Sequence, residues 1–202
     1  NVSYYEIGYR NHVDIEGKGP FYTCSPEFLK PFYEVKGDLQ LGVMTDYKRY
    51  NANDFPNKSN DFIDFVRIAC HPDKIAESLN VAEDLQKKGY KIFIQLMEIQ
   101  NVGADGYIEL FQWKNKNILE SLYFADSYSA LKPEDIEKYY NKLKTIGYEK
   151  LSFHAHNELG LALENSLRAA ELGCYTIDTT FNGIGRGGGN LKLQELLENL
   201  PC

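Results

Sequence analysis

Short β-prone runs recur along the chain, and amphipathic helical segments lie between several of them. A strand, a helix and a second strand in this order form a βαβ unit, which places consecutive strands parallel in one sheet. The pattern predicts strands at Tyr4–Arg10, Leu39–Tyr47, Phe62–Cys70, Lys91–Ile99, Leu119–Ser127, Lys150–His156 and Tyr175–Thr180. It predicts helices at Pro72–Lys88, Pro133–Ile146, Leu159–Leu172 and 191–200, and a loop at Asn51–Asn60.

The predicted strand at 151–156 alternates apolar and polar residues. Successive side chains of a strand point to opposite faces, so Ser152, His154 and His156 are expected on one face. Neutral imidazole is a common ligand of Zn, Mn and Fe, and two neighbouring histidines would fill two positions of a metal's coordination shell. The alternative is that one or both histidines are ordinary half-buried polar residues.

A glycine-rich turn at 183–189 follows the last predicted strand and precedes a helical segment. Its GxGxxG spacing matches a dinucleotide-binding fingerprint, but that fold needs a further strand and an acidic residue about 20 positions on, and the sequence stops at Cys202. Repeated βα units are the preferred interpretation, because ligands of such folds bind where strands end and helices begin.

Composition excludes several classes of protein. A length of 202 residues suits one domain, 1–202, with its own core. The net charge of −7 argues against a nucleic-acid partner, and the sequence contains neither a long apolar run nor a signal peptide. The four cysteines (Cys24, Cys70, Cys174 and Cys202) form no CxxC pair and are expected to be free thiols in the cytoplasm.

The second half of the chain carries a series of motifs in a fixed order. These are His154-Ala-His156-Asn157, Leu159-Gly160, Ala169-Ala170, Gly173, Asp178 and Gly183-Ile-Gly185-Arg186-Gly187-Gly-Gly189-Asn190. Together they resemble the metallolyase TIM-barrel superfamily of the HMG-CoA lyase type, and most closely its 4-hydroxy-2-oxovalerate aldolase-like branch. The resemblance covers nearly the whole chain and is most specific over 151–193.

The resemblance implies an α/β fold, a TIM (β/α)8 barrel. Because a closed barrel needs eight strands and the chain opens at Asn1, without Met, almost directly on a strand, the first βα unit is expected upstream. In the resembled family that unit carries an Arg-Asp pair, which is not found here. Cys202, which follows a helix and a proline, is likewise not expected to be a natural end.

The resemblance also assigns a divalent metal, Mn or Mg first and Zn or Co next. His154 and His156 would bind it, and Asn190 would either complete its shell or cap the next helix, since Asn is a good N-cap. Ser127 would place a hydroxyl near the metal, although Ser129 replaces the family's glycine in this loop. In the turn, Gly185, Arg186 and Gly187 would bind substrate, because glycines let the backbone approach a ligand.

The first strand places further charges on its expected inner face, with Glu6, Gly8 and Arg10 on one side and Tyr5, Ile7 and Tyr9 on the other. Glu6 and Arg10 would act at the metal site or pair with each other. Arg67 interrupts an apolar strand, and a charge there is expected either to pair, with Glu6, or to bind substrate.

The predicted activity is that of a carbon–carbon lyase: an aldolase that cleaves or forms a bond next to a 2-oxo acid such as pyruvate through a metal-stabilised enolate. One alternative is an acyl transferase of the isopropylmalate or homocitrate synthase type, and another is a non-catalytic barrel. The expected partners are a small 2-oxo acid and a second copy of the chain in a homodimer, with no nucleic acid and no membrane.

Overall fold

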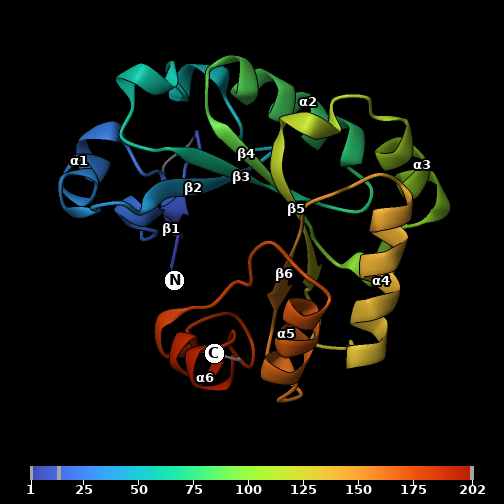
Figure 1. The fold of residues 1–202 in the computed structure, drawn as a ribbon. Helices are drawn as coiled ribbons and strands as arrows, with labels where there is room; N and C mark the ends of the chain where they lie inside the picture. The colour runs from blue at the N-terminus through green and yellow to red at the C-terminus, as the bar shows by residue number, and fades with distance from the viewer. Residues whose placement is uncertain (1, 13–14, 201–202) are drawn as a thin grey trace. The chain divides into compact units, whose positions relative to one another are not determined.

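The structure is a computed structural model that describes residues 2–12 and 15–200. Its sheet has six strands in chain order, each next to the following one (Figure 1). The strands are β1 (Tyr4–Tyr9), β2 (Gln40–Asp46), β3 (Phe65–Cys70), β4 (Lys91–Leu96), β5 (Leu119–Asp126) and β6 (Leu151–Ala155). The helices are α1 (Pro26–Val35), α2 (Ile75–Lys87), α3 (Ala104–Gln112), α4 (Pro133–Thr145), α5 (Ala162–Glu171) and α6 (Leu193–Asn199).

The pairs β1–β2, β2–β3 and β5–β6 are parallel. Parallel strands that alternate with helices confirm the α/β prediction and match part of a (β/α)8 barrel. The upstream first unit stays a prediction. In the part of the chain that the structure describes, no helix is both long and apolar enough to cross a membrane.

Six of the predicted strands are confirmed, but the strand predicted at 175–180 is not one. This segment makes isolated bridges, from Ile177 to Phe153 and from Thr180 to Lys192, instead of a continuous ladder. The predicted helices are present with shorter ends, and α1 and α3 were not predicted. Cys24, Cys70 and Cys174 are free thiols, as expected, whereas Cys202 lies outside the described residues.

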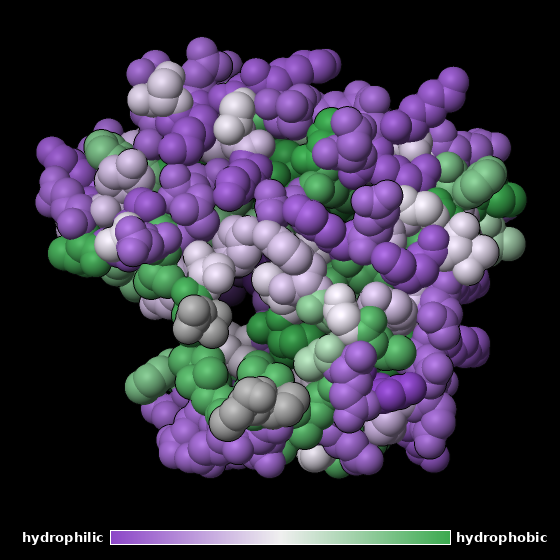
Figure 2. Space-filling view, in the orientation of Figure 1, coloured by the Kyte–Doolittle hydropathy of each residue, from purple (hydrophilic) through white to green (hydrophobic). Residues whose placement is uncertain are grey.

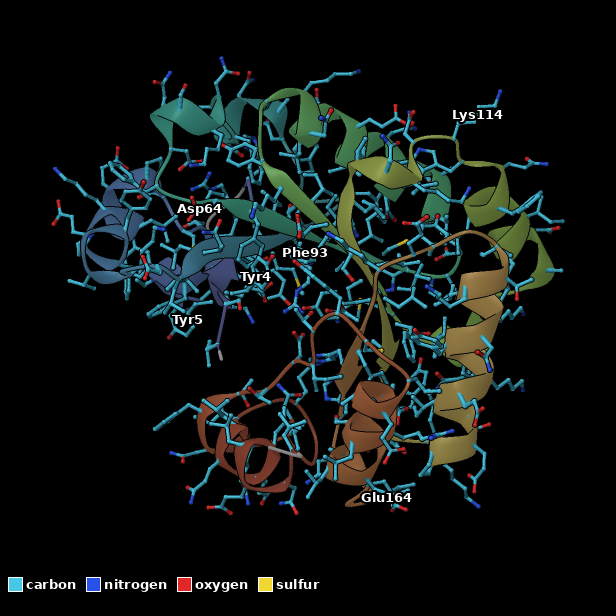
Figure 3. All side chains as sticks on the ribbon, in the orientation of Figure 1. Tyr4, Tyr5, Asp64, Phe93, Lys114 and Glu164 are labelled. Atoms are coloured by element: carbon cyan, nitrogen blue, oxygen red, sulfur yellow. The ribbon has the colours of Figure 1, made fainter. Side chains whose placement is uncertain are left out.

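The chain divides into two compact units, and each unit has its own core. The first contains Asn1–Cys70, Lys74–Ile94 and Asn117–Glu120. One face of its strands carries an aromatic cluster in which the Tyr4 ring lies 5.6 Å from that of Phe65 and 5.0 Å from that of Phe93. Tyr4 and Phe93 are labelled in Figure 3. Edge-to-face packing of this kind stabilises beyond the area that the rings bury.

Strand β1 contains a β-bulge that changes which side chains share a face. Glu6 pairs with Gly42 and Gly8 pairs with Val43, so Ile7 is an extra residue without a counterpart on β2. One inserted residue reverses the alternation that follows. The expectation that Glu6, Gly8 and Arg10 share one face is therefore wrong. Tyr5 and Tyr9 are 53% and 41% exposed.

Asp64, labelled in Figure 3, is a buried carboxylate that joins three parts of the first unit. It accepts a hydrogen bond from Leu41 N at 3.0 Å and forms ion pairs with Lys36 and Lys58 at 3.0 and 3.1 Å. Burial alone would raise the pKa of Asp64, but the hydrogen bond and the two lysines outweigh burial and lower it. The native fold therefore favours the ionised carboxylate.

We expect Asp64→Asn to lower the free energy of unfolding at pH 7 by about 2 kcal/mol, because hydrogen bonds to a charged group are lost. A carboxyl group whose pKa is lower in the folded protein than in the unfolded chain stabilises the fold at pH values above its unfolded pKa of about 4. This stabilisation disappears as the pH falls through the folded pKa. The difference between the variant and the natural protein should thus shrink below about pH 4. Urea unfolding across pH measures it, with the exposed Asp38→Asn as control. A difference that does not change with pH would contradict the assignment.

The second unit contains His71–Asp73, Gln95–Lys116 and Ser121–Cys202. Helices α4 and α5 pack against each other and against β6. Their buried residues include Ile136, Leu143 and Ala169, and the rings of Phe124 and Phe153 lie 5.0 Å apart between β5 and β6. Figure 2 shows hydrophilic side chains over much of the visible face of α4. This core fixes β6, which contains His154 and is followed directly by His156.

Candidate metal and substrate site

Strand β6 has the predicted alternation. Leu151, Phe153 and Ala155 are all at most 1% exposed. On the other face, Ser152 lies within hydrogen-bond distance of Ser121 and Thr176, with oxygen–oxygen distances of 2.6 and 2.8 Å. His154 and His156 continue that polar face, and their ring centroids are 5.1 Å apart. The structure therefore brings the two predicted ligands together at the carboxyl end of β6.

His154 is held by a carboxylate that sequence reasoning did not assign to a role. Its Nδ1 lies 2.9 Å from Oδ2 of Asp178, and both side chains are largely buried. An Nδ1–H donated to a carboxylate fixes the ring and leaves Nε2 to bind a ligand, which is the usual support of a metal-bound histidine. The only sequence signal was the position of Asp178 in the motif series.

His156 is 6% exposed, and its Nδ1 is buried without a hydrogen-bond partner among the described residues. Burial lowers the pKa of His156, and the nearby charges of His154 and Arg186 lower it further. A lowered pKa keeps the imidazole neutral at pH 7, and neutral imidazole is the form that binds metals. An unpaired buried nitrogen is costly, so a ligand on this ring would relieve that cost.

Asn190 forms an isolated antiparallel bridge with His156. Its Nδ2 donates to Ile184 O at 3.1 Å, whereas its Oδ1 is buried without a partner among the described residues. The alternative role as a helix cap is wrong, because α6 begins at Leu193 and its N-cap is Lys192. Asn190 as a metal ligand stays a prediction that the unpaired Oδ1 supports.

A metal site made only of acidic, histidine or cysteine side chains is not present: no group of three or more of them in the described part of the chain could hold a metal ion. The donors that fit are instead two imidazoles and one amide oxygen. Two of the three residues carry an unpaired buried polar atom. These residues fit a divalent ion that takes its remaining ligands from water, substrate or other parts of the protein.

The glycines of the turn make room for the chain's own side chains. A Cβ on Gly185 would lie 2.6 Å from Cγ of Asn190, and one on Gly187 would lie 1.8 Å from Oε1 of Glu158. A Cβ on Gly188 would lie 2.5 Å from the Cα of Glu158. Gly185 therefore packs closely against Asn190, and Gly187 and Gly188 pack closely against the segment after His156. Substrate binding by Gly185, Arg186 and Gly187 stays a prediction.

The loop after β5 is built around Asp126, Ser127 and Ser129. Asp126 accepts hydrogen bonds from Ala130 N and Leu131 N at 2.9 and 3.2 Å. The hydroxyl of Ser127 accepts from Glu98 N at 2.9 Å, so the predicted hydroxyl near the metal also holds the β4 loop.

Ser129 occupies the position where the resembled family has glycine. Its φ of 55° is in the left-handed region that favours glycine. Its hydroxyl donates to His156 O at 2.7 Å, a bond that glycine could not make. The substitution therefore keeps the backbone turn and adds a hydrogen bond to the strand end that carries the histidines.

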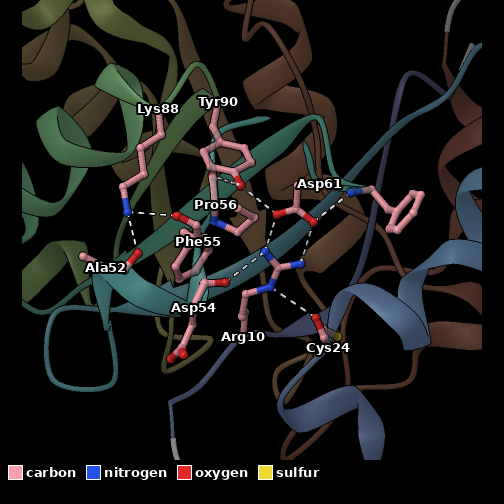
Figure 4. A network of polar contacts seen from close by, with 10 residues as sticks. Arg10, Cys24, Ala52, Asp54, Phe55, Pro56, Asp61, Lys88 and Tyr90 are labelled. Atoms are coloured by element: carbon pink, nitrogen blue, oxygen red, sulfur yellow. Dashed lines mark hydrogen bonds and ion pairs between the residues drawn. The ribbon is translucent and has the colours of Figure 1, made fainter. Parts of the chain in front are cut away.

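In the first unit, Arg67 and Glu6 form a two-point ion pair, with nitrogen–oxygen distances of 2.7 and 2.8 Å. The predicted pairing of Arg67 with Glu6 is confirmed, whereas the Glu6–Arg10 pair is wrong. Arg10 lies beyond the bulge and pairs with Asp61 (Figure 4). Its Nε donates to Cys24 O, and Nη1, which also contacts Asp61, donates to Asp54 O, so the described contacts of Arg10 are structural. Catalytic roles for Glu6, Arg10 and Ser127 stay predictions.

The parallel βα fold and the histidine pair at a strand's carboxyl end define a barrel-type α/β domain with a candidate metal site. The chain belongs to the HMGL-like family, whose model matches residues 55–201.

Comparison with curated proteins gives relatives that are named as enzymes. The oxaloacetate decarboxylase of Mycobacterium tuberculosis (strain ATCC 25618 / H37Rv) is 26% identical in a match that covers 98% of this chain and 59% of that protein. The 4-hydroxy-2-oxovalerate aldolase of Carboxydothermus hydrogenoformans is 28% identical over 85% of this chain and 51% of that protein. The chain thus spans between half and three fifths of the length of these two relatives.

Among solved structures, the N-terminal domain of a putative aldolase from Bacteroides vulgatus is similar, with a TM-score of 0.86 and 26% identity. The match covers 97% of this chain and 66% of that one. The predicted resemblance to the HMG-CoA lyase type is therefore confirmed at the level of family and fold.

Proposed function

We propose that the natural full-length protein is a divalent-metal-dependent lyase that cleaves or forms a carbon–carbon bond next to the carbonyl of a 2-oxo acid. The observation that carries this proposal is the pair His154 and His156, one ring oriented by Asp178 and the other with an unpaired buried Nδ1. The two relatives named above act, by their names, on oxaloacetate and 4-hydroxy-2-oxovalerate, which are both 2-oxo acids.

In this proposal His154 Nε2, the His156 ring and Asn190 Oδ1 would hold the metal. When bound, a divalent ion supplies Lewis acidity toward the keto oxygen of the substrate and lowers the cost of negative charge there. Mn or Mg is the first choice because a keto acid offers hard oxygen donors, and Zn or Co comes next.

Other features of this chain would support binding of the metal and of the substrate. Asp178 keeps the proton of His154 on Nδ1 and so presents Nε2 to the site. The low pKa of His156 prevents a proton from occupying that ring at pH 7. The charge of Arg186, which acts on His156, favours an anionic group such as a substrate carboxylate nearby.

The test uses the full-length protein with and without added Mn²⁺. Mass spectrometry of pyruvate measures how fast its C3 protons exchange for deuterium in deuterated water. We expect exchange that needs the metal and that falls in His154→Ala and His156→Ala by more than the roughly 10–100-fold loss typical of outer-shell partners. Asp178→Asn should fall within that roughly 10–100-fold range, because it only orients a ligand. His71→Ala is the matched control and should retain exchange.

The outcomes separate the candidate functions. Metal binding that depends on both histidines, without exchange, would favour an acyl transferase of the synthase type or a non-catalytic barrel. Metal content that is the same in the natural protein and in the double variant His154→Ala/His156→Ala would overturn the site itself.

A further inference from the structure

Four hydroxyl groups form a continuous chain on the polar face of β6, next to the histidine pair. Thr176 Oγ1 donates to Ser152 Oγ at 2.8 Å and lies 2.7 Å from the hydroxyl of Tyr123. Ser152 Oγ lies 2.6 Å from Ser121 Oγ, which donates to Lys150 O at 3.2 Å. Each hydroxyl has one proton, so each donates to the next, from Tyr123 through Thr176 to the two serines. Hydrogen bonds in such a chain polarise and strengthen one another.

The chain reaches segment 175–180, which also contains Asp178. Thr176 is 24 positions after Ser152, and Asp178 is 24 positions after His154. Side chains two positions apart on a strand share a face. The hydroxyl contact and the histidine–carboxylate contact are therefore neighbouring rungs of one register between β6 and this segment.

The described backbone contacts between β6 and segment 175–180 are one isolated bridge, from Phe153 to Ile177, and three hydrogen bonds. A slip of one residue would place Ile177 or Thr179 opposite His154 and remove the carboxylate from its Nδ1. Such a slip would also take the donor away from the hydroxyl of Ser152, whose side chain is 0% exposed. A buried hydroxyl without its partner is costly, so the hydroxyl contact opposes the slip.

We propose that Thr176 is a positioning residue. Its hydroxyl is held between Ser152 and Tyr123 and fixes the register of segment 175–180 on β6. That register keeps the Asp178 carboxylate on Nδ1 of His154. The consequence for metal binding rests on the proposed lyase function, whereas the position of the proton on the His154 ring can be measured without metal.

The experiment measures which nitrogen of His154 carries the proton. The full-length protein is labelled with ¹⁵N-histidine and kept metal-free with a chelator at about pH 8.5, where histidine is ordinarily neutral. The ¹⁵N chemical shifts of the ring distinguish Nδ1–H from Nε2–H, and a His154→Gln variant identifies the signals. We expect the natural protein to carry the proton on Nδ1, because the carboxylate of Asp178 accepts it.

Thr176→Val removes the hydroxyl and nearly keeps the shape of the side chain. We expect it to lower the ratio of Nδ1–H to Nε2–H by roughly three- to tenfold, the equilibrium equivalent of one hydrogen bond. Thr176→Ser keeps the hydroxyl and should restore the ratio. Ser152→Ala removes the same contact, so it should match Thr176→Val, and the double variant should lower the ratio no further. Thr145→Val is the matched control, because it removes a hydroxyl on the exposed end of α4 and should change nothing.

Asp178→Ala is the reference for a lost carboxylate and should lower the ratio at least as far. If Asp178→Ala lowers the ratio and Thr176→Val does not, the hydroxyl does not set the register and the proposal is overturned, while the lyase function stands. The proposal is also overturned if Thr176→Ser loses as much as Thr176→Val. The expected ratios in a protein that shows no metal-dependent exchange of pyruvate would support the positioning role of Thr176 and count against the lyase function alone.

Discussion

Replacing Arg10 with methionine is expected to lower the free energy of unfolding by about 3–5 kcal/mol, the range found when one partner of a buried ion pair is removed. The side chains of Arg10 and Asp61 are 2% and 0% exposed, and they are joined by contacts of 2.5 and 3.1 Å. Arg10 also donates to Cys24 O at 3.1 Å and lies over the Phe55 ring (Figure 4). Without it, Asp61 keeps a buried charge whose remaining described side-chain partner is Tyr90.

Urea unfolding at pH 7 measures this effect, and two comparisons define its cause. Arg168→Met removes an exposed arginine that pairs with Glu137 and Glu171, and should cost no more than about 1 kcal/mol. The double variant Arg10→Met/Asp61→Leu should recover much of the loss, because apolar residues can replace a buried pair. A loss of less than about 1 kcal/mol in Arg10→Met would show that the pair is not structural.

The second large effect is expected for Gly188→Ala. The new Cβ would lie 2.5 Å from Glu158 Cα, 2.6 Å from Glu158 N and 2.9 Å from Asn157 C. These are backbone atoms directly after His156, so no side-chain rotation relieves the clash. We expect a loss of about 2–3 kcal/mol in the free energy of unfolding, as for overpacking in a tight interior. Asn190 follows on the same turn, so the variant should also weaken metal binding.

Calorimetric titration of Mn²⁺ and urea unfolding test both parts of this prediction. Gly103→Ala is the matched control, because its Cβ would meet nothing within 4 Å and its φ of −74° suits any residue. If Gly188→Ala binds metal and unfolds like the control, the turn does not position the candidate site.

Local pattern was sufficient to predict most of the fold. Buried runs such as Phe65–Cys70 are β-prone and bounded by turns, and α4 begins with the expected Pro133. Helix α1 was missed because Pro31 lies inside it, and a proline normally ends a helix. Segment 175–180 was predicted as a strand from its composition, but composition does not fix continuous pairing with a neighbouring strand, and the segment makes isolated bridges.

The site was predictable where it depends on alternation along one strand, as for His154 and His156. Two contacts that hold the histidines were not predicted, because they join segments distant in the sequence. The bond from Asp178 to His154 spans 24 positions, and that from Ser129 to His156 O spans 27. The bulge at Ile7 has no composition signal, so Arg10 was placed on the wrong face.

That bulge changes the face to which side chains point along β1, so Glu6 before it and Arg10 just after the strand meet different partners. Glu6 neutralises Arg67 on one side of the sheet, and Arg10 neutralises Asp61 on the other. Deleting Ile7 would bring Glu6 and Arg10 to the same side of the sheet. Arg67 would then lie near the attractive charge of Glu6 and the repulsive charge of Arg10. Sequence comparisons that align this segment without a gap therefore risk equating residues that face different environments.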